Sequence, residues 1–169
     1  EPLYYYPSET MDYLNISGKY FVIFGLANKK SVAAAIASTL LDQGGEVILV
    51  VRSKQRQETA GKLFPQCPAF ICDVEDEQQI VVVKKEIEGW MQEHQVASLA
   101  GIVHSIAFAN YSEGLTPFHA TQKRDFLQAV DISCFSFISI ANHFKDLLSP
   151  DGSMVTISIS TTRMAAENY

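Results

Sequence analysis

Residues 46–51 read EVILVV, an unbroken run of apolar, mostly β-branched side chains. Such a run, with no polar alternation, is typical of a strand covered on both faces, as in a parallel sheet. The segment Lys19–Gly25 (KYFVIFG) is an earlier apolar run that ends in glycine. Between the two runs, the alanine-rich segment Ser31–Gln43 predicts a helix. This order of strand, helix and strand predicts a crossover between two parallel strands.

The first predicted helix is expected to pack against the sheet through one apolar face. Val32, Ile36 and Leu40 are spaced so that they share a face of the helix. Gly44 follows the last periodic residues and is expected to stop the helix.

The rest of the chain continues the alternation of strands and helices. In order, the segments are a short polar helix (Gln55–Leu63), a strand (Ala69–Cys72), a helix with a capping box of Asp76 and Gln79 and a stripe of Ile80, Val83, Ile87 and Trp90, a strand (Leu99–Ser105), a loop (Ser112–Pro117), a long helical pattern over 121–148, a turn (Pro150–Gly152) and a strand (Ser153–Ser158). This alternation predicts an α/β fold, a three-layer Rossmann-type doubly wound parallel sheet, truncated after about the fifth strand. We expect residues 1–15 to be an N-terminal extension and residues 16–169 to form a single Rossmann-type dinucleotide-binding domain.

The charge balance of the chain is acidic. Its 169 residues include 13 Lys and Arg against 19 Asp and Glu, a formal net charge of -6, and 47% are hydrophobic. An acidic chain is a poor candidate for binding nucleic acids or anionic membranes, which need a basic face, and we expect neither partner. No apolar run is long enough to span a membrane, and the first residues lack the pattern of a signal peptide. Three cysteines without metal or redox spacing indicate reduced thiols in a cytoplasmic protein, and no metal site is expected.

Ligands of doubly wound sheets bind at the carboxyl ends of the strands, and the first two strand ends are informative. The turn at residues 25–31 (GLANKKS) could offer amide groups and a helix N-terminus to a pyrophosphate. It has a single glycine instead of the G-x-G-x-x-G pattern, so an ordinary strand–helix turn is the alternative. Arg52, Ser53 and Lys54 follow the second strand, where NAD-binding folds usually have an acidic residue. Arginine there suits a 2′-phosphate through charge-assisted hydrogen bonds, and a solvated basic loop is the alternative.

The three later strand ends have weaker signals. Asp73 could accept a hydrogen bond from an adenine amino group or could cap the next helix, and these two interpretations are compatible. The small residues after His104 would let a ribose approach the backbone, while His104 itself is interpreted as a structural histidine. Tyr169 would lie just beyond the fifth strand, close to a bound nicotinamide, although a terminal tyrosine alone indicates nothing.

Taken together, these segments resemble one family. They are, in order, GLANKKS at 25–31, VVR at 50–52, CDV at 72–74, HSIAFAN at 104–110, DIS at 131–133 and NY at 168–169. The set is similar to the enoyl-(acyl-carrier-protein) reductases of bacterial fatty acid synthesis, within the short-chain dehydrogenase/reductase superfamily. The resemblance extends over nearly the whole chain, from Gly18 to Tyr169, and HSIAFAN is its most specific segment.

The resemblance implies an enzyme that uses NADPH, with NADH as the alternative cofactor. It implies Gly25, Ala27, Ser31 and Val32 at the pyrophosphate; Arg52, Ser53 and Lys54 where NADPH-using members have basic residues; Asp73 and Val74 at adenine; Ser105, Ile106, Ala107 and Ile132 near the nicotinamide-side ribose; and Ala107, Phe108 and Ala109 at the substrate pocket. The implied reaction reduces trans-2-enoyl-acyl-carrier-protein thioesters by hydride transfer to the β-carbon. Tyr169 matches the catalytic tyrosine that binds the thioester oxygen and stabilises its charge. Homo-oligomers are also implied.

The sequence departs from the family pattern in three places. The family's lysine lies beyond the tyrosine, where this sequence ends; a second family tyrosine corresponds to Ile159; and a glycine of the first helix is replaced by Ala35. The chain could therefore be part of a longer enzyme, a truncated form, or a degenerate Rossmann module that binds nucleotide or a partner without catalysis. A ketone-reducing relative would need a serine ahead of the tyrosine. Ser158 and Ser160 are candidates, but HSIAFAN favours the enoyl reductases.

Overall fold

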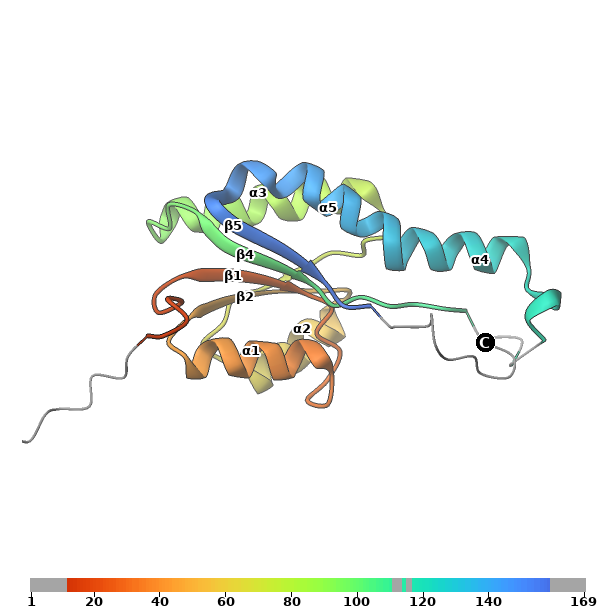
Figure 1. The fold of residues 1–169 in the computed structure, drawn as a ribbon, viewed down its shortest axis with the longest axis horizontal. Helices are drawn as coiled ribbons and strands as arrows, with labels where there is room; N and C mark the ends of the chain where they lie inside the picture. The colour runs from red at the N-terminus through yellow and green to blue at the C-terminus, as the bar shows by residue number, and fades with distance from the viewer. Residues whose placement is uncertain (1–11, 111–113, 115–116, 159–169) are drawn as a thin grey trace, which may run out of the picture.

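Five parallel strands form one sheet in the order β3-β2-β1-β4-β5 in the computed structural model, which describes residues 12–110, 114 and 117–158 (Figure 1). The strands are β1 (Tyr20–Phe24), β2 (Glu46–Val51), β3 (Ala69–Ile71), β4 (Leu99–His104) and β5 (Leu148–Thr156). The strand order reverses between β1 and β4, which makes their carboxyl ends the topological switch point of the sheet. The predicted Rossmann-type doubly wound sheet is confirmed.

The main helices cover both faces of the sheet. They are α1 (Val32–Asp42), α2 (Lys54–Leu63), α3 (Glu77–Glu93), α4 (Lys123–Val130) and α5 (Ser136–Phe144). Helices α1 and α2 lie below the sheet in Figure 1, and α3 and α5 lie above it. This arrangement gives the three layers that the alternation of strands and helices predicts.

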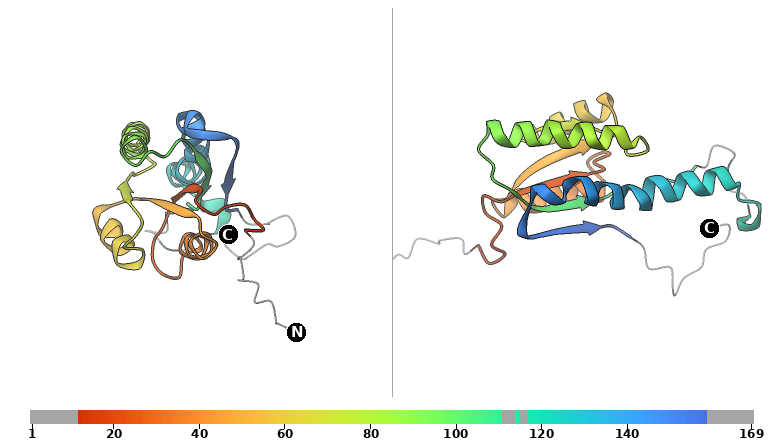
Figure 2. Two further views of the ribbon diagram at one scale, coloured as in Figure 1. Left: turned by 90° about the vertical axis from the view of Figure 1, so that its left-hand side faces the viewer. Right: turned by 90° about the horizontal axis from the view of Figure 1, so that it is seen from above.

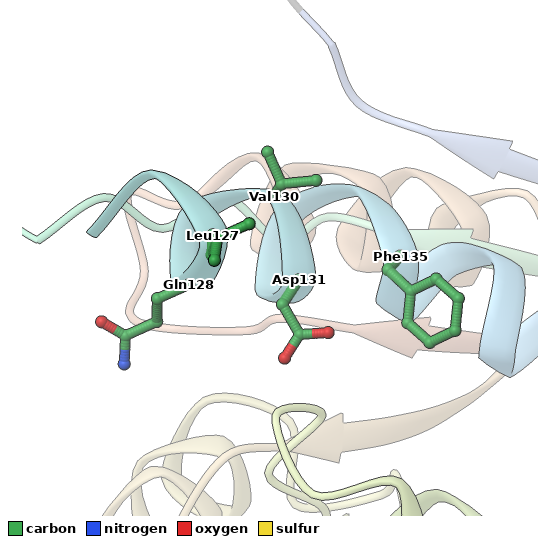
Figure 3. Close-up of a pocket in the computed structure, with 5 residues that line it drawn as sticks. All are labelled: Leu127, Gln128, Val130, Asp131 and Phe135. Atoms are coloured by element: carbon green, nitrogen blue, oxygen red, sulfur yellow. The ribbon is translucent and has the colours of Figure 1, made fainter. Parts of the chain in front are cut away.

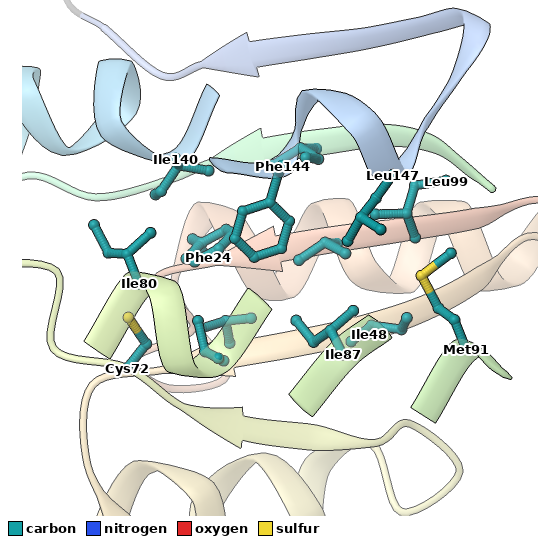
Figure 4. Close-up of a cluster of buried hydrophobic side chains, with 14 residues drawn as sticks. Phe24, Ile48, Cys72, Ile80, Ile87, Met91, Leu99, Ile140, Phe144 and Leu147 are labelled. Atoms are coloured by element: carbon teal, nitrogen blue, oxygen red, sulfur yellow. The ribbon is translucent and has the colours of Figure 1, made fainter. Parts of the chain in front are cut away.

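The side chains of β2 enter two hydrophobic cores. Ile48 and Val50 pack in the core beneath α3 and α5 (Figure 4), while Val47, Leu49 and Val51 pack in the core beneath α1 and α2. These five side chains are at most 2% exposed. The unbroken apolar run therefore forms a strand covered on both faces, as predicted.

The apolar face predicted for α1 is confirmed in part. Ile36 and Leu40 are partly buried and pack against the core, whereas Val32 is 52% exposed. The fully buried side chains of the helix are instead Ala33, Ala34 and Ala37. Small side chains let the helix backbone approach the sheet closely, and alanine has the highest helix propensity. The stripe of larger residues therefore lies to one side of the contact face.

The long helical segment after residue 121 is present but is not one regular α-helix. Helix α4 continues into a π-helix, η2 (Asp131–Phe135), then α5 and a short 3₁₀ turn, η3 (Lys145–Leu147). Leu148, the last residue of the predicted helical pattern, instead begins β5. Figure 2 shows that α4 extends past the end of the sheet. Phe126 and Val130 of the predicted stripe are consequently exposed, whereas Phe144 is buried.

The turn predicted at residues 150–152 lies inside β5. Leu148 pairs with Leu99 and Ser153 pairs with Gly101, so β5 has several extra residues between two paired positions. A β-carbon on Gly152 would lie 2.9 Å from the Ser149 carbonyl oxygen, which shows how tightly the segment folds back. The turn residues thus form a bulge within β5, which also ends earlier than predicted, at Thr156.

Candidate nucleotide-binding site

A cavity of about 280 Å³ lies at the carboxyl ends of β1, β2, β3 and β4. Of the residues predicted for the site, it is lined by Gly25, Ala27, Arg52, Asp73, Val74, Ser105, Ile106, Ala107, Phe108 and Ile132. The predicted residues Ser31, Val32, Ser53, Lys54 and Ala109 are absent from this lining. Tyr169 and Ile159 lie outside the described residues. Four strand ends that are far apart in the sequence therefore meet in one cavity, as expected at a switch point.

Gly25 occupies a position that no larger residue can take without distortion. Its φ is 97°, and a β-carbon there would lie 2.1 Å from the Ser105 carbonyl oxygen. The amide of Ser105 donates to the Phe24 carbonyl at 3.0 Å, which joins the ends of β4 and β1 just before this contact. The glycine therefore lets two chain segments close the floor of the cavity.

The turn between β1 and α1 is held by local hydrogen bonds. The Ser31 hydroxyl donates to the Asn28 carbonyl at 2.7 Å and accepts from the Ala34 amide at 3.3 Å, which makes Ser31 the N-cap of α1. The Asn28 side chain accepts from the Lys30 amide at 2.8 Å. The turn thus presents the positive end of α1 at the cavity side of the sheet. Ser31 serves this arrangement as a cap without lining the cavity.

Two arginines lie at the mouth of the cavity. Arg52 Nε donates to Asp73 Oδ2 at 3.2 Å, and the Arg52 guanidinium lies 5.9 Å from the centroid of the Phe108 ring. The Arg56 guanidinium donates to the Ala27 carbonyl, in the turn before α1. Arg56 was missed by the sequence analysis, although it lies one helical turn beyond Arg52. Ser53, between them in the chain, is the N-cap of α2.

The helix after β3 is capped differently from the prediction. Asp76 is the N-cap of α3 and accepts from the Gln78 amide at 3.0 Å. The Gln79 amide oxygen accepts from the Asp73 amide at 2.9 Å, so the predicted reciprocal capping box of Asp76 and Gln79 does not form. Asp73 is not the cap either: its carboxylate accepts from the Glu75 amide and from Arg52.

His104 is a buried structural histidine, as interpreted from the sequence. The Ser136 hydroxyl donates to the Ile132 carbonyl at 2.7 Å, so its oxygen accepts a hydrogen bond from His104 Nε2–H at 2.8 Å. His104 Nδ1 then accepts from the Thr156 hydroxyl at 3.0 Å. Burial lowers the pKa of His104, so the neutral ring is favoured. The ring therefore joins β4 to β5 and to the first residue of α5.

The π-helix η2 places two neighbouring side chains at the site. Ile132 is buried and lines the cavity. The Ser133 hydroxyl accepts from the Phe108 amide at 2.9 Å and donates to the Phe108 carbonyl at 3.1 Å. Single π-turns within α-helices are frequent at functional sites. Ser133 belongs to the DIS segment at 131–133, but no role could be predicted for it from sequence, because the widened turn has no recognisable sequence signal.

One of the three cysteines lies at the site. Cys72 lines the cavity, and burial raises its pKa to about 12, with further upward shifts from the nearby carboxylates of Asp73 and Asp76. Cys67 is also buried and Cys134 is exposed; all three are free thiols, as expected. Within the described part of the chain, no cluster of His, Cys, Asp or Glu could hold a metal ion.

A second hollow, of about 410 Å³, lies on the surface of α4 and η2 (Figure 3). It is lined by Leu127, Gln128, Val130, Asp131 and Phe135. None of the residues predicted for the site lines it. The cavity at the switch point is therefore the candidate nucleotide-binding site.

The residues of that cavity could hold a nicotinamide dinucleotide. Gly25 leaves room for close backbone approach, α1 begins beside it, and the guanidiniums of Arg52 and Arg56 lie at its mouth. The fold and the cavity together define a Rossmann-type nucleotide-binding domain.

The enoyl-(acyl carrier protein) reductase family model matches residues 25–169, and the chain belongs to this family. The chain is 30% identical over 161 residues to the enoyl-(acyl-carrier-protein) reductase (NADPH) FabI of Staphylococcus aureus, covering 92% of this chain and 61% of that protein. It is 31% identical over 155 residues to the enoyl-(acyl-carrier-protein) reductase (NADH) FabI of Enterococcus faecalis, covering 91% of this chain and 60% of that protein.

Solved structures agree with this assignment. The reductase of Anaplasma phagocytophilum in complex with NAD has a TM-score of 0.81 and 30% identity, over 91% of this chain and 58% of that one. The Bacillus cereus reductase with NADP⁺ and indole naphthyridinone has a TM-score of 0.82 and 28% identity, over 91% and 60%. The chain thus spans about 60% of the length of these relatives. Among the described residues, no helix combines the length and apolarity needed to cross a membrane.

Proposed function

We propose that this chain provides the dinucleotide site of an enzyme that reduces trans-2-enoyl thioesters of acyl carrier protein in fatty acid elongation. The observation that carries the proposal is the cavity at the switch point, where Arg52 and Arg56 lie beside the Gly25 turn. Membership of the enoyl reductase family supports the substrate class.

Each part of the dinucleotide has a proposed set of contacts. Gly25, Ala27, Ser31 and Val32 would hold the pyrophosphate, Arg52, Ser53 and Lys54 the 2′-phosphate, Asp73 and Val74 the adenine, and Ser105, Ile106, Ala107 and Ile132 the nicotinamide-side ribose. The hydrogen-bonded turn at Ser31 supports the first set, because its amide groups are oriented before a ligand binds. Arg56 is added to the 2′-phosphate set, since it lines the same cavity as Arg52.

The bound cofactor supplies the hydride that the β-carbon of the enoyl group receives. The chain's own contribution is to hold the thioester and to stabilise the negative charge that develops on its oxygen. We assign this stabilisation to the hydroxyl of Tyr169, which would donate a hydrogen bond to that oxygen. Ala107, Phe108 and Ala109, in the segment after β4, would line the substrate pocket together with Tyr169.

NADPH is the preferred cofactor in this proposal, with NADH as the alternative. Relatives with each cofactor in their names match the chain, so the preference rests on the residues after β2. A guanidinium attracts a 2′-phosphate through charge-assisted hydrogen bonds, whereas an acidic residue at that place would repel it. We further propose that the enzyme acts in the cytoplasm and that copies of it associate.

Turnover tests the proposal. The full-length gene product, mixed with NADPH and a crotonyl thioester of acyl carrier protein, should consume NADPH and produce the saturated butyryl thioester. The butyryl thioester itself is the matched control and should give no consumption. If the protein consumes NADPH only with an acetoacetyl thioester, it is a ketone reductase instead. No turnover with either the crotonyl or the acetoacetyl thioester would contradict the proposal.

A second candidate function is a nucleotide-binding module without catalysis. It is favoured by Ile159, which replaces a family tyrosine near the substrate. This candidate predicts saturable binding of NADPH together with no turnover of any enoyl thioester, so the same experiment separates it from the first.

A further inference from the structure

Phe108 has both of its backbone polar groups bound by one side chain. Its amide donates to Ser133 Oγ at 2.9 Å, and Ser133 Oγ donates to its carbonyl at 3.1 Å. The two bonds join the segment after β4 to η2, across 25 positions of sequence. Ser133 therefore fixes the backbone of Phe108 on both sides of its α-carbon, and with it the direction in which the side chain leaves the backbone.

The Phe108 ring in turn contacts Arg52. The guanidinium lies 5.9 Å from the ring centroid, within the range of a cation–π interaction. The Arg52 side chain is 60% exposed, so it has few other packing contacts that select one rotamer. Phe108 on one side and Asp73 on the other thus define where the guanidinium lies.

Ser133 itself lies on a rigid support. Its neighbour Ile132 is 5% exposed, and the Ile132 carbonyl accepts from the Ser136 hydroxyl at 2.7 Å. Ser136 also accepts from the buried ring of His104. These bonds connect η2 to β4 through Ser136 and His104. Because η2 is held in this way, the Ser133 hydroxyl stays in place and keeps the Phe108 backbone in place.

We propose that Ser133 is a positioning residue for the 2′-phosphate site, acting through Phe108 on the guanidinium of Arg52. The inference rests on the proposed binding of NADPH in this cavity. Loss of the Ser133 hydroxyl releases the Phe108 backbone, and the ring then no longer holds Arg52 in one place. The affinity for a nucleotide with a 2′-phosphate falls, while the affinity for NADH changes little because NADH lacks the phosphate that this guanidinium would bind.

Calorimetric titration of the complete chain with NADPH and with NADH tests this role. Ser133→Ala should raise the Kd for NADPH roughly fivefold, the size of a cation–π contribution, and should leave the Kd for NADH within about twofold. Ser133→Thr retains the hydroxyl and should restore the wild-type ratio of the two constants. Ser139→Ala is the control, because its hydroxyl bonds to Glu77 where α5 meets α3 and Ser139 does not line the cavity. Phe108→Leu, which lacks the ring, should reproduce the effect of Ser133→Ala even if the latter folds poorly.

A double-mutant cycle with Arg52 completes the test. In an Arg52→Ala background, Ser133→Ala should not weaken NADPH binding further, because the group it positions is gone. Equal losses for NADPH and NADH, or the same loss with and without Arg52, would overturn the positioning role while leaving the proposed function intact. A wild-type chain that binds neither nucleotide would instead contradict the proposed function, and this inference with it.

Discussion

Arg52 and Asp73 face each other across the mouth of the cavity, with 3.2 Å between Nε and Oδ2. They follow β2 and β3, which are neighbours in the sheet. Their side chains are 60% and 30% exposed, and an ion pair this exposed contributes at most about 1 kcal/mol to stability. The pair therefore acts by orientation: Asp73 holds the guanidinium at the place where an NAD-binding fold usually has an acidic residue.

Arg52→Asp should weaken the binding of NADPH by about tenfold or more, because charge-assisted hydrogen bonds contribute roughly 1.5–3 kcal/mol each. NADH binding should change much less. Fluorescence titration with both nucleotides measures the two constants. Lys85→Asp, which makes the same charge change on exposed α3, is the control and should leave both constants unchanged. An equal loss for NADPH and NADH in Arg52→Asp would refute the 2′-phosphate role.

Arg56→Met should also weaken NADPH binding, by about three- to tenfold, because it removes a second cation from the cavity and the hydrogen bond to the Ala27 carbonyl. Lys62→Met, in the last turn of the same helix, is the matched control for charge and side-chain type. The measurement is the Kd for NADPH in each variant. If Lys62→Met has the same effect, the loss reflects net charge and not the cavity.

Gly25→Ala should destabilise the fold by roughly 1–3 kcal/mol from backbone strain alone, since φ is 97° there, and by more because of the contact with Ser105. Gly61→Ala is the opposite case: it lies in α2 with nothing within 4 Å of the new β-carbon. It should stabilise by about 0.5–1 kcal/mol. Urea denaturation gives both free energies of unfolding. Similar values for the two variants would contradict the close approach described at Gly25.

His104 should make the stability of the fold depend on pH. Burial lowers its pKa from the ordinary value of 6.5, so the unfolded chain binds the proton more readily than the folded one. The stability that neutral His104 contributes is fully present above pH 6.5, the ordinary pKa. It is lost as the pH falls from 6.5 through the lowered pKa of the folded chain. The His104→Gln variant should be less stable than the wild type near neutral pH. Its free energy of unfolding should, however, depend less on pH below 6.5. His119→Gln, in the exposed turn Phe118–Ala120, should retain the wild-type slope; a steep slope in His104→Gln would show that other groups cause the dependence.

The sheet could be predicted from sequence because its strands are apolar runs separated by polar helices and turns. EVILVV in β2 is the clearest case, since its side chains enter both cores. The alanine face of α1 was not predictable from hydrophobic spacing, because Ala33, Ala34 and Ala37 make their contact through small size and not through strong hydrophobicity. The bulge in β5 was missed because Pro150 and Gly152 indicate a turn equally well in either setting.

The candidate site was predictable to the extent that its residues follow strand ends. Gly25, Arg52 and Asp73 were found by that rule and line one cavity. The contacts of Ser133 with Phe108 and of Arg56 with Ala27 join segments far apart in the chain. No local pattern encodes such contacts, because they depend on the π-turn of η2 and on where α2 begins.

Binding of NADPH in the cavity at the switch point can be measured by calorimetric titration of the complete chain with NADPH, and separately with NADH. We expect saturable binding of both nucleotides, with the lower Kd for NADPH. Tighter binding of NADH than of NADPH, or no binding of either, would contradict this expectation.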